Sequence, residues 1–233
     1  MEKKFFLSLK KKILKKNYEI NELILKILNK NLFITYLLIL INIIIYYILF
    51  LFPNKIKFFV LSSKKISFSF YNLITNYQII TNFFSHIDFK HILFNMFYLF
   101  IFGFIIENKI GKLKFLLYYL FTGIFSSLFQ ILFLYYTDFN NFYILGASGA
   151  IYGLLGIIYV FYPIYKIKIF SKKYCIKFSK FIIYFLFLSI FDLLFKLNLN
   201  VGHISHITGI LIGIFLGFIS KKCFIYKKKL KQK

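Results

Sequence analysis

Long apolar runs alternate with short polar segments along most of this chain, a pattern typical of a protein that crosses a membrane several times. A helix needs about 20 mostly apolar residues to cross the hydrocarbon core of a bilayer. The runs that approach this length lie at about 31–52, 91–106, 115–136, 146–163, 179–195 and 200–219. The pattern therefore predicts an all-α membrane protein with six transmembrane helices.

The polar segments outside these runs predict three parts. Residues 1–30 combine clustered lysines with spaced isoleucines and leucines, which predicts a basic amphipathic helix on the inner membrane surface. Residues 31–219 form the six-helix domain, and residues 220–233 form a basic cytoplasmic tail. Residues 53–85 are too polar to cross a membrane and are expected to form an external loop with short interfacial helices.

The lysines indicate how the helices are oriented. If the amino end is cytoplasmic, 25 of the 31 basic residues fall on the cytoplasmic side. Short cytoplasmic loops of membrane proteins carry such an excess, so both termini are predicted to be cytoplasmic. In a soluble protein the net charge of +24 would suggest a nucleic-acid partner. Here contact with anionic lipid headgroups is the better interpretation, and no nucleic-acid partner is expected.

Reactive polar side chains gather at the starts of three apolar runs. The clusters are His86, His91 and Asn95 for the second run, Ser148 for the fourth, and His203 with His206 for the sixth. Ionisable groups are costly at membrane depth, so each cluster is a hypothesis for a functional site. The second, fourth and sixth helices run in the same direction, which places all three clusters near the outer surface.

Glycines predict that two of these clusters meet. Gly146 and Gly149 flank Ser148, and Gly209 and Gly213 follow His206. Small residues let helices pack closely, and this packing would bring His206 against Ser148. Histidine is the common base that activates a serine nucleophile. No carboxylate lies near His206 in the sequence, so the pattern predicts a Ser–His dyad rather than a triad.

Several further residues are candidates for supporting roles. Tyr152, one turn after Ser148, could stack on the imidazole and orient it, although plain core packing is an equal alternative. The acyl-transfer intermediate needs donors for its oxyanion, and His91, Asn95 and the Ser148 backbone N–H could supply them. Asn95 could instead make an interhelical hydrogen bond. His86 is either a further candidate for the oxyanion or a loop histidine bonded to nearby carbonyls, and His203 is expected at the rim of the site.

Two other classes of protein, a zinc enzyme and a transporter, fit the polar residues less well than a serine protease does. A zinc site would need three or four ligands at suitable spacing, but His86 and His91 are five residues apart and have no adjacent glutamate. No metal and no cofactor are therefore expected. A transporter would need charged or broken helices at mid-membrane. Asp192 is the acidic candidate, and its pairing with Lys196 is interpreted as an interfacial anchor.

In this order, the three clusters resemble the rhomboid family of intramembrane serine proteases. The resemblance runs from about residue 77 to 217. His86 to Asn95 is similar to the family pattern HxxxxHxxxN, Gly146 to Gly149 to GxSG, and His206 to Gly213 to HxxGxxxG. Glu107 and Gly111 resemble an ExxxG turn of the family. One departure is Tyr77-Gln78, which stands where the family often has Trp-Arg, so the anchoring of that loop is open.

The resemblance implies a six-helix rhomboid-like bundle with Ser148 as nucleophile and His206 as base. It implies His91, Asn95 and the Ser148 amide at the oxyanion, and substrates that are transmembrane or membrane-anchored proteins cut in or near their membrane segments. A bacterial cytoplasmic membrane with the site facing outward is expected, and no oligomeric state is specified. The alternative is a rhomboid-like membrane chaperone or adaptor that binds transmembrane helices without efficient cleavage.

Overall fold

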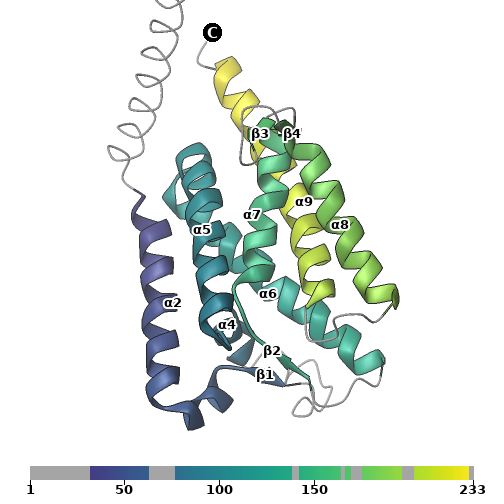
Figure 1. Cartoon of the computed structure of the whole chain (residues 1–233). Coiled ribbons are helices and arrows are strands. Elements are labelled where there is room, and N and C mark those ends of the chain that lie inside the picture. The colour runs from purple at the N-terminus through teal and green to yellow at the C-terminus, as the bar shows by residue number, and fades with distance from the viewer. Residues whose placement is uncertain are drawn as a thin grey trace, which may run out of the picture. The chain divides into compact units, whose positions relative to one another are not determined.

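Helices make up most of the described part of this computed structural model (Figure 1). The structure describes residues 32–62, 77–137, 142–163, 166–168, 175–195 and 202–230. Its contacts divide the chain into two units, Met1–Phe33 and Ile34–Lys233. The amphipathic helix expected in residues 1–30 lies outside the described residues.

Each of the six apolar runs coincides with a helix. Four described helices are long and apolar enough to cross a membrane: α2 (Phe33–Leu51), α5 (Phe89–Ile110), α6 (Lys112–Tyr136) and the stretch His203–Cys223 of α9 (His203–Leu230). Two more apolar helices are shorter, namely α7 (Ser148–Phe161) and the stretch Ile182–Phe195 of α8 (Phe178–Phe195). By length and composition, therefore, four of the six are candidate membrane-spanning helices.

The ends of two helices differ from the expected limits. Helix α5 continues through polar residues to Ile110. The single residue Gly111, with φ of 88°, ends it there and connects it to α6. Only glycine adopts such a backbone readily. Helix α9 begins at His203 and continues to Leu230, into the segment expected to be a separate tail. Lysine is a good helix former, so a lysine-rich segment can extend a helix that is already formed.

Short elements connect α2 to α5 and α6 to α7. Their bounds are η1 (Pro53–Phe58), β1 (Leu61–Ser62), α4 (Gln78–Thr81), η3 (Asn82–Phe84) and β2 (Tyr143–Ile144). Strands β1 and β2 pair antiparallel, as do β3 (Lys166–Lys168) and β4 (Cys175–Lys177). The all-α prediction did not include these two ladders, because strands this short leave no alternating pattern in a sequence.

The loop before α5 is anchored by amide and hydroxyl groups. The Gln78 side chain donates from Nε2 to the Lys57 carbonyl at 2.7 Å, and Thr81 Oγ1 donates to the Phe59 carbonyl at 3.2 Å. Gln78 is buried whereas Tyr77 is exposed. Gln78 therefore ties this loop to η1.

Helix α7 occupies the centre of the unit that begins at Ile34. It packs against α5, α6, α8 and α9, and Figure 1 shows it between α5 and α9. Its 14 residues span about 21 Å at 1.5 Å per residue. Most of its side chains are buried, as expected for a helix that is apolar on all faces. The first residue of this central helix is Ser148.

Candidate active site

Glycines hold α7 and α9 at very close range. A Cβ added at Gly213 would collide with the Gly153 carbonyl, and one added at Gly209 would collide with the Gly149 carbonyl. A Cβ at Gly156 would collide with the Ile210 carbonyl on the opposite helix. The two backbones therefore approach each other as closely as glycine allows. The expected glycine contact between the fourth and sixth apolar runs is present.

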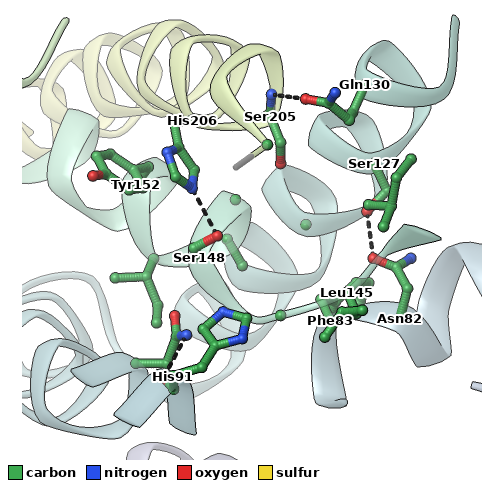
Figure 2. A pocket seen from close by; sticks show the side chains of 18 of the residues that line it. Asn82, Phe83, His91, Ser127, Gln130, Leu145, Ser148, Tyr152, Ser205 and His206 are labelled. Atoms are coloured by element: carbon green, nitrogen blue, oxygen red, sulfur yellow. Dashed lines mark hydrogen bonds between the residues drawn. The ribbon is translucent and has the colours of Figure 1, made fainter. Parts of the chain in front are cut away.

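This packing brings Ser148 and His206 together. Ser148 Oγ lies 2.8 Å from His206 Nε2, which is within hydrogen-bond distance (Figure 2). For the hydroxyl to donate, Nε2 must be unprotonated, so the ring proton must be on Nδ1. In this tautomer the imidazole can accept the serine proton. The arrangement is that of a nucleophile and its general base.

Tyr152 lies against one face of the His206 imidazole. Its ring stacks on that of His206 with a centroid separation of 4.2 Å and an interplanar angle of 22°. Phe185 of α8 contacts the tyrosine ring edge-on at 5.8 Å. The His206 ring is thus oriented by an aromatic ring that is itself supported by the neighbouring helix.

His91 and Asn95 lie on the first turns of α5, beside the segment that leads into α7. A Cβ at Gly146 would come within 2.7 Å of His91 Nε2, so glycine is the residue that lets the ring approach. Gly146 also has φ of 108°, which disfavours any other residue. Figure 2 shows the His91 and His206 rings on either side of Ser148. Asn95 is buried and donates one amide hydrogen from Nδ2 to the His91 carbonyl at 2.9 Å.

The other two histidines are buried beside these rings. His86 precedes α5, and its ring contacts that of His91 edge-on at a centroid distance of 4.9 Å. Burial and the neighbouring His91 lower the pKa of the His86 imidazole to about 3, so the ring is neutral. His203 is the first residue of α9, and its ring centre is 6.4 Å from that of His206. Its expected position at the rim was wrong, because only 6% of the residue is exposed.

The amino end of α7 carries no side-chain cap. Ala147 occupies the cap position and makes no side-chain hydrogen bond to the helix. The first amides of a helix have no partner within it, and they attract negative charge. The Ser148 amide is among them, so this end can stabilise an anion that forms beside the serine.

A cavity of about 870 Å³ opens onto Ser148 and His206. Besides the residues expected from the sequence, it is lined by a polar group that sequence reasoning missed: Asn82, Ser127, Gln130 and Ser205. Gln130 Oε1 accepts the Ser205 amide at 3.0 Å and so fixes the start of α9 (Figure 2). Ser127 and Gln130 are three residues apart in an apolar helix, a signal that could have identified them.

Comparisons with known proteins agree in one family. The model of the rhomboid domain matches residues 75–223, more than half of the chain. The Bacillus subtilis protein YdcA, which is named as a rhomboid protease, is 32% identical over 143 residues, or 61% of this chain and 66% of the relative. The rhomboid protease GlpG of Haemophilus influenzae is 26% identical over 137 residues, or 59% of this chain and 66% of the relative.

A plant relative is also similar. Rhomboid-like protein 11, chloroplastic, of Arabidopsis thaliana is 36% identical over 100 residues, which cover 43% of this chain and 34% of the relative. The chain spans less than two thirds of the length of each of these relatives. The similarity therefore concerns the shared domain, and the match to the rhomboid domain model spans every position placed at the cavity.

Proposed function

This chain belongs to the rhomboid family of integral membrane proteins, and on that premise we propose that it is an intramembrane serine endopeptidase. The observation that carries the proposal is the 2.8 Å contact between Ser148 Oγ and His206 Nε2 at the wall of the cavity. A serine within hydrogen-bond distance of a neutral imidazole is the minimal pair needed for acyl transfer.

The proposed reaction has two stages. Ser148 Oγ attacks the carbonyl carbon of the scissile peptide bond while His206 Nε2 takes the hydroxyl proton. His206 then gives this proton to the leaving amine, which leaves an ester between the substrate and Ser148. Water attacks the ester with the same imidazole as base, and the acid product is released as Ser148 recovers its proton.

Three groups support the oxyanion in this scheme. His91 contributes its ring, Asn95 the amide hydrogen that is not bonded to the His91 carbonyl, and Ser148 its backbone N–H. Tyr152 maintains the plane of the imidazole, and His86 supports the His91 ring. The glycines are proposed to act through packing: Gly146 admits the His91 ring, and Gly149, Gly209 and Gly213 admit the partner helix.

The proposed substrates are transmembrane or membrane-anchored proteins cut in or near their membrane segments. We further propose six membrane crossings, cytoplasmic termini, anionic lipid headgroups around the basic segments, and an outward-facing site in a bacterial cytoplasmic membrane. The lysine distribution supports this orientation. The proposed parts remain a basic segment at residues 1–30, the protease domain at 31–219 and a basic segment from 220 to 233.

Labelling with a fluorophosphonate tests the proposal, because this reagent reacts with activated serines. The wild-type protein in liposomes should be labelled and should cleave a fluorescent transmembrane peptide. Ser148→Ala and His206→Ala should lose both activities while remaining folded. Cleavage that persists in Ser148→Ala would refute the dyad. Binding of the peptide by wild type with no turnover would instead favour a membrane chaperone or adaptor.

A further inference from the structure

Asn82 is buried at the centre of a hydrogen-bond network that the proposed reaction does not use. It lies at the start of η3, outside the three motifs, and only 1% of it is exposed. All its side-chain hydrogen-bonding atoms have partners. The Nδ2 group donates to the Gln78 and Ile79 carbonyls at 2.8 and 2.7 Å, and Oδ1 accepts from Ser127 Oγ at 2.9 Å.

The backbone of Asn82 contacts the segment that carries the nucleophile. Its carbonyl accepts the Gly146 amide at 2.9 Å, and Gly146 is two residues before Ser148. Glycine loses more conformational freedom on folding than any other residue. Gly146 must nevertheless keep φ at 108° for the His91 ring to fit beside it. The Asn82 carbonyl is the hydrogen-bond partner that holds it there.

This carbonyl can hold Gly146 only if Asn82 itself is fixed. The two Nδ2 bonds fix Asn82 to its own turn, and the Ser127 bond fixes that turn to α6 (Figure 2). Helix α6 also packs directly behind the site, because Ser126 contacts both Gly149 and Gly209. The chain of contacts from α6 through Asn82 to Gly146 therefore ties the nucleophile segment to a rigid helix.

We propose that Asn82 is a positioning residue that, together with Ser127, fixes the backbone of Gly146 and so sets the place of the Ser148 hydroxyl and amide. The inference rests on the proposed function of Ser148. A displacement of the nucleophile by a fraction of an ångström weakens both attack and oxyanion stabilisation. Loss of the network should therefore slow the chemical step more than it weakens substrate binding.

The test compares Ser127→Ala, Asn82→Ala and Ser127→Thr in the full chain. The first removes only the bond to α6, the second removes all three side-chain bonds of Asn82 but keeps its backbone carbonyl, and the third keeps the hydroxyl. Hydrogen exchange at the Gly146 amide is followed by NMR on protein labelled with ¹⁵N-glycine. The chain has 11 glycines, so the labelled spectrum contains few signals. The rate of fluorophosphonate labelling and the kcat and KM for a transmembrane peptide are measured on the same samples.

Tyr118→Phe is the matched control. It also removes one interhelical hydroxyl bond, from Tyr118 to Ser220 at 2.8 Å, but at the end of α9 away from Ser148 and His206. It should lower the Tm about as much as Ser127→Ala does. A general loss of stability would therefore change the Gly146 exchange rate and kcat equally in both variants. A loss of positioning would change them only in Ser127→Ala.

Ser127→Ala should raise the Gly146 exchange rate and lower the labelling rate and kcat by about tenfold, as expected for the loss of one buried hydrogen bond. Asn82→Ala, which loses three bonds, should change these rates at least as much. KM should change less than about twofold, and Ser127→Thr should restore both rates. Unchanged Gly146 exchange, or an equal change in Tyr118→Phe, would overturn the proposal. If wild type is labelled no faster than Ser148→Ala, the proposed function fails, and the exchange rates alone decide whether Asn82 holds Gly146.

Discussion

The orientation of the His206 imidazole depends on the ring that stacks on it. Tyr152 supplies this ring at 4.2 Å, so Tyr152→Phe should keep near wild-type kcat whereas Tyr152→Leu should lower kcat by about two- to tenfold. The reason is that an aliphatic side chain fills space but does not fix the plane of the imidazole. Steady-state cleavage of a transmembrane peptide measures the effect, and full kcat in Tyr152→Leu would contradict the stacking role.

His86 makes the stability of the protein depend on pH. Its pKa falls from 6.5 in the unfolded chain to about 3 in the fold, because burial disfavours the charged ring. Between these two values the unfolded chain binds more protons, so stability is fully present above pH 6.5 and is lost as the pH falls toward 3.

We expect His86 to contribute a loss of about 2 kcal/mol in the free energy of unfolding between pH 7 and pH 5. His86→Gln should remove this part of the pH dependence, although it lowers stability at neutral pH through poorer packing against His91. Unfolding titrations of both proteins at the two pH values measure the difference. Identical pH dependence in wild type and variant would show that His86 is not neutralised by the fold.

The sequence carried more information on some site residues than on others. Ser148 and His206 stand out because each opens an apolar segment and is followed by small residues at helical spacing. Asn82 and Gln130 each accept a hydrogen bond from the backbone amide of a distant segment, that of Gly146 and that of Ser205 respectively. Every residue except proline has such an amide, so no pattern of residue types could have predicted these partners.

At the scale of elements, the contact between α7 and α9 leaves the least room for an added side chain. Gly213→Ala would direct a methyl group at the Gly153 carbonyl, so the helices must separate. Such overpacking should lower the free energy of unfolding by about 1–3 kcal/mol and should slow fluorophosphonate labelling as Ser148 and His206 move apart. Gly202→Ala is the control for stability, because its Cβ would meet the nearest atom, Ser205 Cβ, at an ordinary 3.4 Å. Equal stability of the two variants would argue against a close helix contact.

The start of α2 depends on a carboxylate from α5. Glu107 is 3% exposed, and its oxygens accept the Ile34 amide at 3.1 Å, the Thr35 amide at 2.8 Å and the Thr35 hydroxyl at 2.6 Å. Carboxylates at the amino end of a helix satisfy its open amides and interact well with its dipole. Glu107 therefore joins α5 to α2 at a point away from the proposed dyad.

Glu107→Gln should lower the free energy of unfolding by about 2–3 kcal/mol, because it removes the charge and one acceptor oxygen. The folded Glu107→Gln variant should keep the wild-type rate of fluorophosphonate labelling at Ser148. Thr35→Val, which removes the hydroxyl, should lower the free energy of unfolding less in Glu107→Gln than in the wild type, because the Thr35 hydroxyl and the Glu107 carboxylate share a hydrogen bond. Full additivity of the two losses would contradict this cap.

The helices were more predictable than the contacts between them. Length and apolar content were enough for six helices, and glycine spacing indicated which two would pack most closely. The cap of α2 was not predictable, because Glu107 binds amides that lie more than 70 residues away and these leave no signal in the sequence. The loop before α5 was predicted only to lie at the membrane interface. It also provides Asn82, whose carbonyl accepts the Gly146 amide.

At the scale of the whole domain, the reactive groups come from the same end of three helices. Ser148 is the first residue of α7, His91 the third of α5 and His206 the fourth of α9. Lysines near the opposite ends are partly fixed by the fold, since Lys221 Nζ donates to the Val160 carbonyl at 2.9 Å. If those ends face the cytoplasm, as the charge distribution predicts, the site opens outward.

Cysteine labelling tests this orientation. Cys223 is exposed on α9 beyond Lys221, so it should be inaccessible to a membrane-impermeant maleimide in intact cells and reactive after permeabilisation. A Cys175→Ser background isolates its signal. Asn54→Cys in the exposed η1 segment is the control and should react in intact cells, because the lysine distribution predicts that this segment is external. Labelling of Cys223 from outside, or protection of Asn54→Cys, would reverse the orientation and place the Ser148 end of α7 toward the cytoplasm.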